Sequence, residues 1–262
     1  MRKILLSIVS VVLVFHSDFM CSSELNITKA DDITYDVLTD AGINYVSIFK
    51  EIFGNSRVRT FLEFGYDYPT KYFLDSCHKV ISVGMITHGY GPEPFKKYLA
   101  LYRDCSNWIP LAYLSGYIGD PSWASFKYIG SESVYKAASY QCVTHKNYAL
   151  MDDFYITELN AFIGNLVRYH AIDLAFVNMI GVVLRGDVVQ CLLGKVPVIV
   201  AQDTSMRYGE EKSDLYGYTR VVTPDDYEEI YISKGGGTTV WIQKNNKWNE
   251  LVQVLKNYAN AS

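Results

Sequence analysis

The feature that most constrains the fold is a pair of short apolar runs separated by a short helical stretch. Residues 60–65 are apolar and end in a glycine, which is typical of a strand buried on both faces of a parallel sheet. Residues 71–77 predict one or two helical turns, and residues 80–83 form a second apolar run. A strand, a helix and a second strand make a βαβ unit, so the chain is predicted to be an α/β protein.

The rest of the chain continues this alternation and then changes character. Short apolar runs predict further strands at residues 108–114, 172–177 and 196–201. Mixed apolar patterns predict helices at residues 36–53, 131–141, 156–169, 186–193 and 247–258. Alternating runs predict an antiparallel edge at residues 218–222, 229–233 and 238–243, with a hairpin turn at 235–237. We therefore expect a Rossmann-like, mostly parallel sheet of about seven strands with a C-terminal antiparallel hairpin and helices on both faces.

The N-terminus has the pattern of a targeting segment. Two basic residues precede an apolar run over residues 4–15, which is too short to span a bilayer core of about 30 Å. This predicts a signal peptide at residues 1–23, a single domain at residues 24–262, and export to the periplasm or the medium. A lipoprotein anchored at Cys21 is the alternative. After cleavage, no stable membrane span is expected.

Charge and composition narrow the choice of partner. The chain carries 24 Lys and Arg against 28 Asp and Glu, a formal charge of −4, with a pI of about 5.7. Cleavage after residue 23 leaves it acidic, so it lacks the broad basic face that binding to nucleic acid requires. A small-molecule ligand is the expected partner, and the sequence leaves the oligomeric state open.

Cysteine usage agrees with export without fixing a disulfide pattern. Cleavage leaves four cysteines, at positions 77, 105, 142 and 191, which allow three pairings. We expect at most one disulfide. Cys191 lies in an apolar helical stretch, where a buried free thiol is expected. No spacing of Cys or His suggests a metal site.

Polar residues follow the first predicted strand, at the sheet edge where ligands of such folds collect. Glu63 and Gly65 open this segment, which continues through Tyr66 and Asp67 to Thr70 at the next predicted helix. Glu63 is interpreted either as a ligand contact or as a cap for the donors of that helix, for which Asp67 and Thr70 are also candidates.

This segment resembles the E-x-G-x-G cofactor loop of class I S-adenosylmethionine-dependent methyltransferases, with Glu63 and Gly65 in register. Residues 171–178 resemble the fourth strand of that family, and residues 196–204 resemble a fifth strand that ends in a polar turn. The resemblance implies a methyltransferase-like sheet that binds S-adenosylmethionine. It places the cofactor at Glu63, Gly65, Tyr66, Asp67, Thr70 and Gly84, and the methyl acceptor at Asn178 and Asp203.

Three positions depart from the family pattern. Asp67 occupies the second glycine position of the loop, and Gly84 follows the apolar run of the second strand where the family offers an acid to the ribose hydroxyls. Asp67 either blocks the cofactor or replaces that missing acid. Asn178 stands where an aspartate is usual. Asp203 is interpreted either as a site residue or as a turn former, and Asp173 as a solvated acid at a strand start.

Two functions therefore remain open. One is methyl transfer from S-adenosylmethionine to a small molecule or a surface component. The other is a non-catalytic, exported binding or effector protein on the same scaffold.

Overall fold

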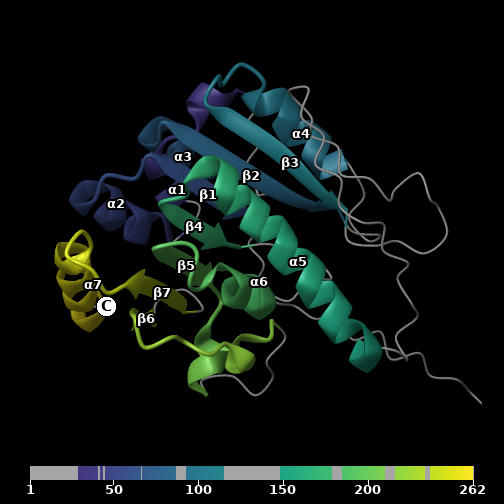
Figure 1. Cartoon of the computed structure of the whole chain (residues 1–262). Coiled ribbons are helices and arrows are strands. Elements are labelled where there is room, and N and C mark those ends of the chain that lie inside the picture. The colour runs from purple at the N-terminus through teal and green to yellow at the C-terminus, as the bar shows by residue number, and fades with distance from the viewer. Residues whose placement is uncertain are drawn as a thin grey trace, which may run out of the picture.

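The computed structural model describes residues 29–40, 42–43, 45–65, 67–86, 93–114, 148–178, 185–209, 216–233 and 237–261 (Figure 1). The α-helices are α1 (Tyr35–Asp40), α2 (Tyr45–Asn55), α3 (Thr70–Ser76), α4 (Glu93–Tyr102), α5 (Tyr148–His170), α6 (Arg185–Leu192) and α7 (Asn249–Ala261). The strands are β1 (Thr60–Phe64), β2 (Lys79–Ile86), β3 (Trp108–Leu114), β4 (Leu174–Val177), β5 (Val198–Gln202), β6 (Tyr227–Ile232) and β7 (Thr238–Gln243). Short 3₁₀ helices are η2 (Ala30–Asp32), η5 (Ser205–Tyr208) and η6 (Tyr218–Arg220).

The strands form one seven-stranded sheet in the order β3-β2-β1-β4-β5-β7-β6. β1 to β5 are mutually parallel, and β7 runs antiparallel to both of its neighbours. This confirms the predicted Rossmann-like sheet with its C-terminal antiparallel hairpin. The order reverses between β1 and β4, which is where ligands of doubly wound folds bind, beyond the carboxyl ends of the strands.

Helices cover both faces of the sheet, as the alternation of strand side chains requires. Phe61 of β1 belongs to the core formed with α1, α2, α3, α4 and α7, whereas Leu62 and Phe64 belong to the core formed with α5 and α6. Figure 1 shows α5 crossing its face of the sheet diagonally. The crossover helices after β1 and β2 lie on the first face, and α6, after β4, lies on the second.

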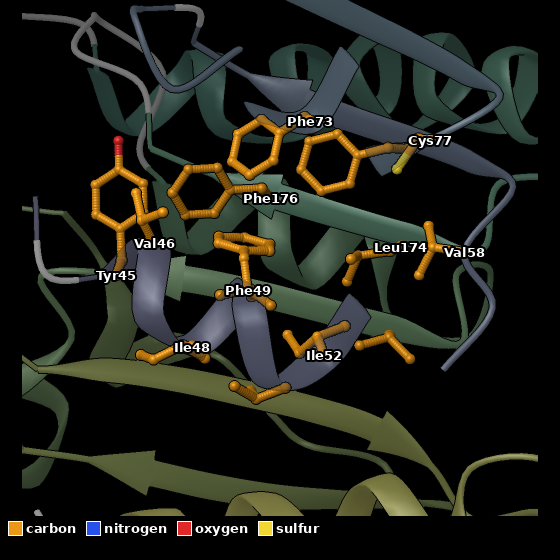
Figure 2. Close-up of a cluster of buried hydrophobic side chains, with 14 of the residues drawn as sticks. Tyr45, Val46, Ile48, Phe49, Ile52, Val58, Phe73, Cys77, Leu174 and Phe176 are labelled. Carbon is orange, nitrogen blue, oxygen red and sulfur yellow. The ribbon is translucent and has the colours of Figure 1, made fainter. Parts of the chain in front are cut away.

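An aromatic cluster fills the first face beneath α2 (Figure 2). The Phe49 ring is fully buried, and its centroid lies 4.8 Å from that of Phe73, 4.9 Å from that of Phe176 and 5.7 Å from that of Phe61. Truncation of a phenylalanine packed in this way costs about 3–5 kcal/mol. At the surface of the same layer, Ser47 Oγ of α2 lies 2.8 Å from the Tyr258 hydroxyl of α7.

The prediction of one continuous N-terminal helix over residues 36–53 is wrong. The chain forms α1 and α2 with a turn between them, where Gly42 has a φ of +77°. The Gly42 amide donates to the Thr39 carbonyl, and the Ile43 amide donates to the Leu38 carbonyl. A glycine adopts this left-handed conformation without steric cost, so it ends α1 and lets α2 begin in a new direction.

The strand predicted at residues 218–222 is also wrong, because this segment contains η6. Arg207 Nη1 donates to the carbonyls of Tyr218, at 2.8 Å, and of Val221, at 2.7 Å, which removes these acceptors from any strand ladder. The same guanidinium forms a two-pronged ion pair with Glu229 of β6, with N···O distances of 2.8 and 2.9 Å. Although burial raises the pKa of Glu229, hydrogen bonds from Arg207, Thr223 and Tyr208 lower it to about 2.

Several predictions fall partly or wholly outside the described residues: the signal peptide, the helix at 131–141, most of the turn at 235–237, and Cys142. Within the described part, Cys77, Cys105 and Cys191 are free thiols, and Cys191 is buried as expected. The described helices include none that is long and apolar enough to cross a membrane.

Candidate functional site at the carboxyl edge of the sheet

The candidate site lies where β1 and β4 end side by side. The Asn178 amide donates to the Phe64 carbonyl at 3.0 Å, so the residue after β4 continues along the end of β1. The Gly65 amide donates to the Val83 carbonyl of β2 at 2.8 Å, and Gly65 has a φ of +93°. A side chain at Gly65 would be strained in this conformation, so the glycine is what allows β1 to turn into the loop before α3.

Gly84 is placed differently from the prediction. It is buried inside β2, where it pairs with Ala112 of β3. β2 continues to Ile86 and does not end at Val83. The expected strand end was therefore wrong. Because Gly65 bonds to the preceding residue of β2, Gly84 still lies beside the start of the loop.

Glu63 is a buried acid held by hydroxyl groups. Glu63 is only 2% exposed. Its Oε1 accepts hydrogen bonds from Thr70 Oγ1, at 2.8 Å, and from Ser82 Oγ. Trp108 Nε1 donates in turn to Ser82 Oγ at 2.7 Å. Burial raises the pKa of Glu63 to about 8, despite the lowering effect of both hydroxyl donors. Glu63 therefore carries a proton in most molecules at neutral pH.

The capping alternative for Glu63 is not what the structure shows, because its contact with α3 goes through the Thr70 hydroxyl and not through a backbone amide. Thr70 is fully buried and begins α3, and its Oγ1 also accepts the Asp67 amide at 3.2 Å. Glu63 and Thr70 are thus joined in one hydrogen-bonded unit that ties the end of β1 to the first turn of α3.

Asp67 folds back against its own loop. Its Oδ1 accepts the Tyr68 amide at 2.8 Å and the Tyr98 hydroxyl of α4, and its carbonyl accepts the Tyr102 hydroxyl at 3.0 Å. These bonds direct the acid at the second glycine position toward α4. Tyr66, which was also predicted to contact the cofactor, lies outside the described residues.

Tyr45 is a central residue that the sequence analysis missed. It begins α2, and its ring centroid lies 5.0 Å from that of Phe176, while its hydroxyl points out of the aromatic cluster (Figure 2). The hydroxyl is hydrogen-bonded to Asn178. Burial raises the pKa of Tyr45, and the charges of Asp67, Glu63 and Asp203 raise it further. Tyr45 thus lies beside the residue that follows β4, and charges at the ends of β1 and β5 also act on it.

Asp203, after β5, forms an ion pair with a buried arginine. Its Oδ2 lies 2.6 Å from Nη1 of Arg185, whose side chain is 1% exposed at the start of α6. The guanidinium lies 4.1 Å from the Tyr216 ring centroid, in a cation–π contact. Asp203 itself adopts a φ of +58°. Arg185, which gives the acid a fixed position and a counter-charge, was not predicted from the sequence.

Asp173 lies at the opposite, amino edge of the sheet, as expected of a strand-start acid, but it is partly buried and hydrogen-bonded and not solvated. Its Oδ2 accepts the amides of Arg59, at 2.9 Å, and Thr60, at 3.1 Å, and Lys247 Nζ lies 3.1 Å from Oδ1. Although burial raises the pKa of Asp173, these donors lower it below its ordinary value. An open hollow of about 460 Å³ between the ends of α2 and α3, lined in part by Arg57 and His78, lies at this same amino edge and away from the candidate site.

The carboxyl edge of the sheet brings together side chains that can form hydrogen bonds with a ligand. It gathers a protonated acid, an aspartate, an amide and a tyrosine hydroxyl around the point where the strand order reverses. Within the described residues, no cluster of three or more His, Cys, Asp or Glu side chains could hold a metal ion. The site therefore provides hydrogen-bond acceptors and donors.

Comparison with known proteins gives structural likeness and no sequence match. No protein-family model matches the chain, and no curated protein matches it. Among solved structures, it is similar to a Staphylococcus aureus protein assigned as a caffeoyl-CoA O-methyltransferase, with a TM-score of 0.47 and 12% identity over 79% of this chain and 91% of that one.

Two further structures show the same kind of likeness. The Podospora anserina methyltransferase PaMTH1, bound to S-adenosylhomocysteine (SAH), has a TM-score of 0.40 and 9% identity over 82% of this chain and 81% of that one. A Bacillus cereus O-methyltransferase in complex with SAH has a TM-score of 0.41 and 10% identity over 85% and 94%. Strand order, the antiparallel β7 and the turn at Gly65 establish the architecture within this chain itself. The chain has a Rossmann-like α/β fold, a mostly parallel seven-stranded sheet with a C-terminal antiparallel hairpin and helices on both faces.

Proposed function

We propose that the carboxyl edge binds S-adenosylmethionine and that the protein transfers its methyl group to a small molecule or a surface component. The observation that carries this proposal is the buried Glu63, placed directly before the glycine turn at the point where the strand order reverses. This is the position at which a Rossmann-like sheet binds its ligands. Two of the similar solved structures contain SAH, which supports the same choice of ligand.

The residues present fit this cofactor. Gly65 lets the backbone turn tightly at the end of β1, which leaves room for a ligand to approach the main chain. Asp67 Oδ1 accepts hydrogen bonds from the Tyr68 amide and from the Tyr98 hydroxyl of α4, and no described residue donates to its Oδ2. That oxygen is available to a ribose hydroxyl, in place of the acid that Gly84 does not provide.

The bound cofactor would supply an electrophilic methyl group on its sulfonium. The protein's own part is binding and orientation: Glu63 and Asp67 hold the cofactor side, while Tyr45 and Asn178 offer a hydroxyl and an amide on the acceptor side. The Arg185 guanidinium fixes Asp203 at the end of β5.

A second function, a non-catalytic exported binding protein, is favoured by the ion pair of Asp203. Arg185 bonds to the one acid predicted on the acceptor side, and the other predicted position there is the neutral Asn178. In this alternative, the same edge binds its ligand without turnover.

Ligand-induced stabilisation separates these possibilities. S-adenosylmethionine or SAH at about 100 times its Kd should stabilise the fold by about 2.7 kcal/mol, which a melting curve detects. Gly65→Val should abolish the shift. Gly209→Val is the matched control, because Gly209 also has a positive φ (+79°) and has open space around its Cβ position, but caps η5.

The outcomes are distinct. A shift with both ligands, together with formation of SAH from S-adenosylmethionine in the presence of an acceptor extract, supports the methyltransferase. A shift without turnover supports the binding protein. If neither ligand gives a melting shift or a calorimetric heat at millimolar concentration, binding of this cofactor is refuted.

We also propose that the protein is exported after cleavage near residue 23, on the basis of the basic start and the apolar run at residues 4–15. Mass spectrometry of the protein from its native host should find an N-terminus near Glu24, or a lipid on Cys21. Recovery of an intact cytosolic form that begins at Met1 contradicts export.

A further inference from the structure

Glu63 is a buried acid without a counter-charge. The groups whose charges act with it are Asp67 of the loop, Tyr45 of α2, Cys77 after α3 and Tyr102 of α4, all of which are acids. The cations of the neighbouring helices have other partners: Lys71 of α3 pairs with Asp75, and Lys97 of α4 bonds to the Tyr68 hydroxyl at 2.7 Å. Among the described residues, no cation hydrogen-bonds or ion-pairs with Glu63.

The hydrogen bonds of Glu63 are nevertheless arranged for a carboxylate. Trp108 has only an N–H to give, and it donates to Ser82 Oγ, so the Ser82 proton is directed to Glu63 Oε1. Thr70 Oγ1 accepts the Asp67 amide and likewise directs its own proton to Oε1. Two donors therefore face one oxygen, and the acid proton of the neutral form resides on Oε2.

From this geometry we propose that Glu63 is a charge-sensing acid: it is neutral in the free protein and releases its proton when a positively charged ligand binds at the carboxyl edge. On binding, the O–H bond at Oε2 breaks and the proton passes to the solvent. Thr70 and Ser82 remain in place as donors to the carboxylate. The choice of S-adenosylmethionine as the cationic ligand rests on the proposed function.

The distance along β1 makes the coupling strong enough to measure. In this proposal the positive charge of the ligand lies at the turn at Gly65, two residues after Glu63, which corresponds to about 7 Å along a strand. At an effective dielectric of about 20, a positive charge at that distance shifts the ionisation equilibrium of an acid by roughly 50-fold. Burial holds the pKa of Glu63 at about 8 in the free protein. A shift of that size therefore converts Glu63 from mostly protonated to mostly ionised at pH 7.

Calorimetry in two buffers with different heats of ionisation counts the protons released. At pH 7, S-adenosylmethionine binding to the wild type should release about 0.7 proton more than binding to Glu63→Gln, as the 50-fold shift requires. SAH lacks the sulfonium charge and should release less. The α-amino group of either ligand titrates near pH 8, and the variant measures that contribution separately. Glu250→Gln, an exposed site on α7, is the matched control and should behave as the wild type.

A spectroscopic readout covers the case in which Glu63→Gln does not fold. The infrared spectrum of the free wild type should contain the C=O stretch of a protonated carboxyl, and addition of S-adenosylmethionine should remove it. Persistence of that band, or equal proton release by wild type and Glu63→Gln, refutes charge sensing and leaves the proposed function intact. Absence of binding by both ligands refutes the proposed function and this inference with it.

Discussion

Replacement of Glu63 by glutamine should make the unliganded protein more stable, by an amount that grows with pH. The amide keeps the shape of the protonated acid and an oxygen that can accept from Thr70 and Ser82. It cannot ionise, so it removes the cost of a buried charge without removing the hydrogen bonds.

The magnitude follows from the pKa of Glu63, which is about 8 in the folded protein against an ordinary value of 4.5 for a glutamate exposed to water. Between these two pH values, the folded state holds a proton that the unfolded state has released. The free energy of unfolding therefore falls as pH rises, by about 1.4 kcal/mol per pH unit. Relative to acid pH, the wild type loses about 3 kcal/mol by pH 7 and about 5 kcal/mol above pH 8 through this one group.

Urea unfolding of wild type and Glu63→Gln at pH 5, 7 and 8.5 measures the difference. The two proteins should have similar stability at pH 5, and the variant should be more stable by several kcal/mol at pH 8.5. Glu250→Gln, at an exposed position, should reproduce the pH dependence of the wild type. Parallel curves for wild type and Glu63→Gln over this range would show that Glu63 is ionised in the fold, and the reasoning from its burial would be wrong.

Three further substitutions test other parts of the structure. Glu229→Gln should lower the free energy of unfolding at pH 7 by about 2 kcal/mol, after allowance for solvent screening. The wild type should lose stability as pH falls from 4.5 to about 2, and urea unfolding should show that the variant lacks this loss. Gly186→Ala should destabilise the fold by more than about 2 kcal/mol, because the added Cβ would lie 2.2 Å from the Gly217 oxygen. Gly164→Ala, which has open space around its Cβ position in α5, should instead stabilise the fold by about 0.5–1 kcal/mol, and melting curves compare the two variants. Tyr45→Phe should cost about 1 kcal/mol through loss of one hydrogen bond and should weaken ligand binding in calorimetry; unchanged binding would place the hydroxyl outside the ligand site.

Much of the sheet could be predicted because its strands carry their own signal. β3 and β7 have the predicted bounds, because the apolar run of β3 and the alternating run of β7 are local features of the sequence. A strand boundary differs from the prediction where a neighbouring strand extends it. β2 continues past Val83 because β3 supplies hydrogen-bonding partners as far as Leu114. At residues 218–222 the outcome depended on Arg207, a remote side chain that takes the carbonyls a strand would need.

The candidate site divides in the same way. Glu63 and Gly65 could be found because strand, acid and glycine turn are consecutive in the sequence. Tyr45 and Arg185 could not, because each begins a helix outside the strand-end segments and reaches the site only through packing of that helix on the sheet. An aromatic residue at the start of an apolar helix is the one local signal for Tyr45, and it is equally typical of a core residue.

The contact between α2 and α7 links the helix that carries Tyr45 to the last helix of the chain. Ser47 and Tyr258, which meet across these helices, are 211 positions apart in the chain. Contacts of such separation form late and slow the folding of a domain. Because Tyr45 lies in the same helix as Ser47, the packing around its helix is complete only when α7, the last helix, is in place. A nascent chain that stops short of α7 therefore has its strand-end acids and α2, but lacks part of the surface on which α2 packs.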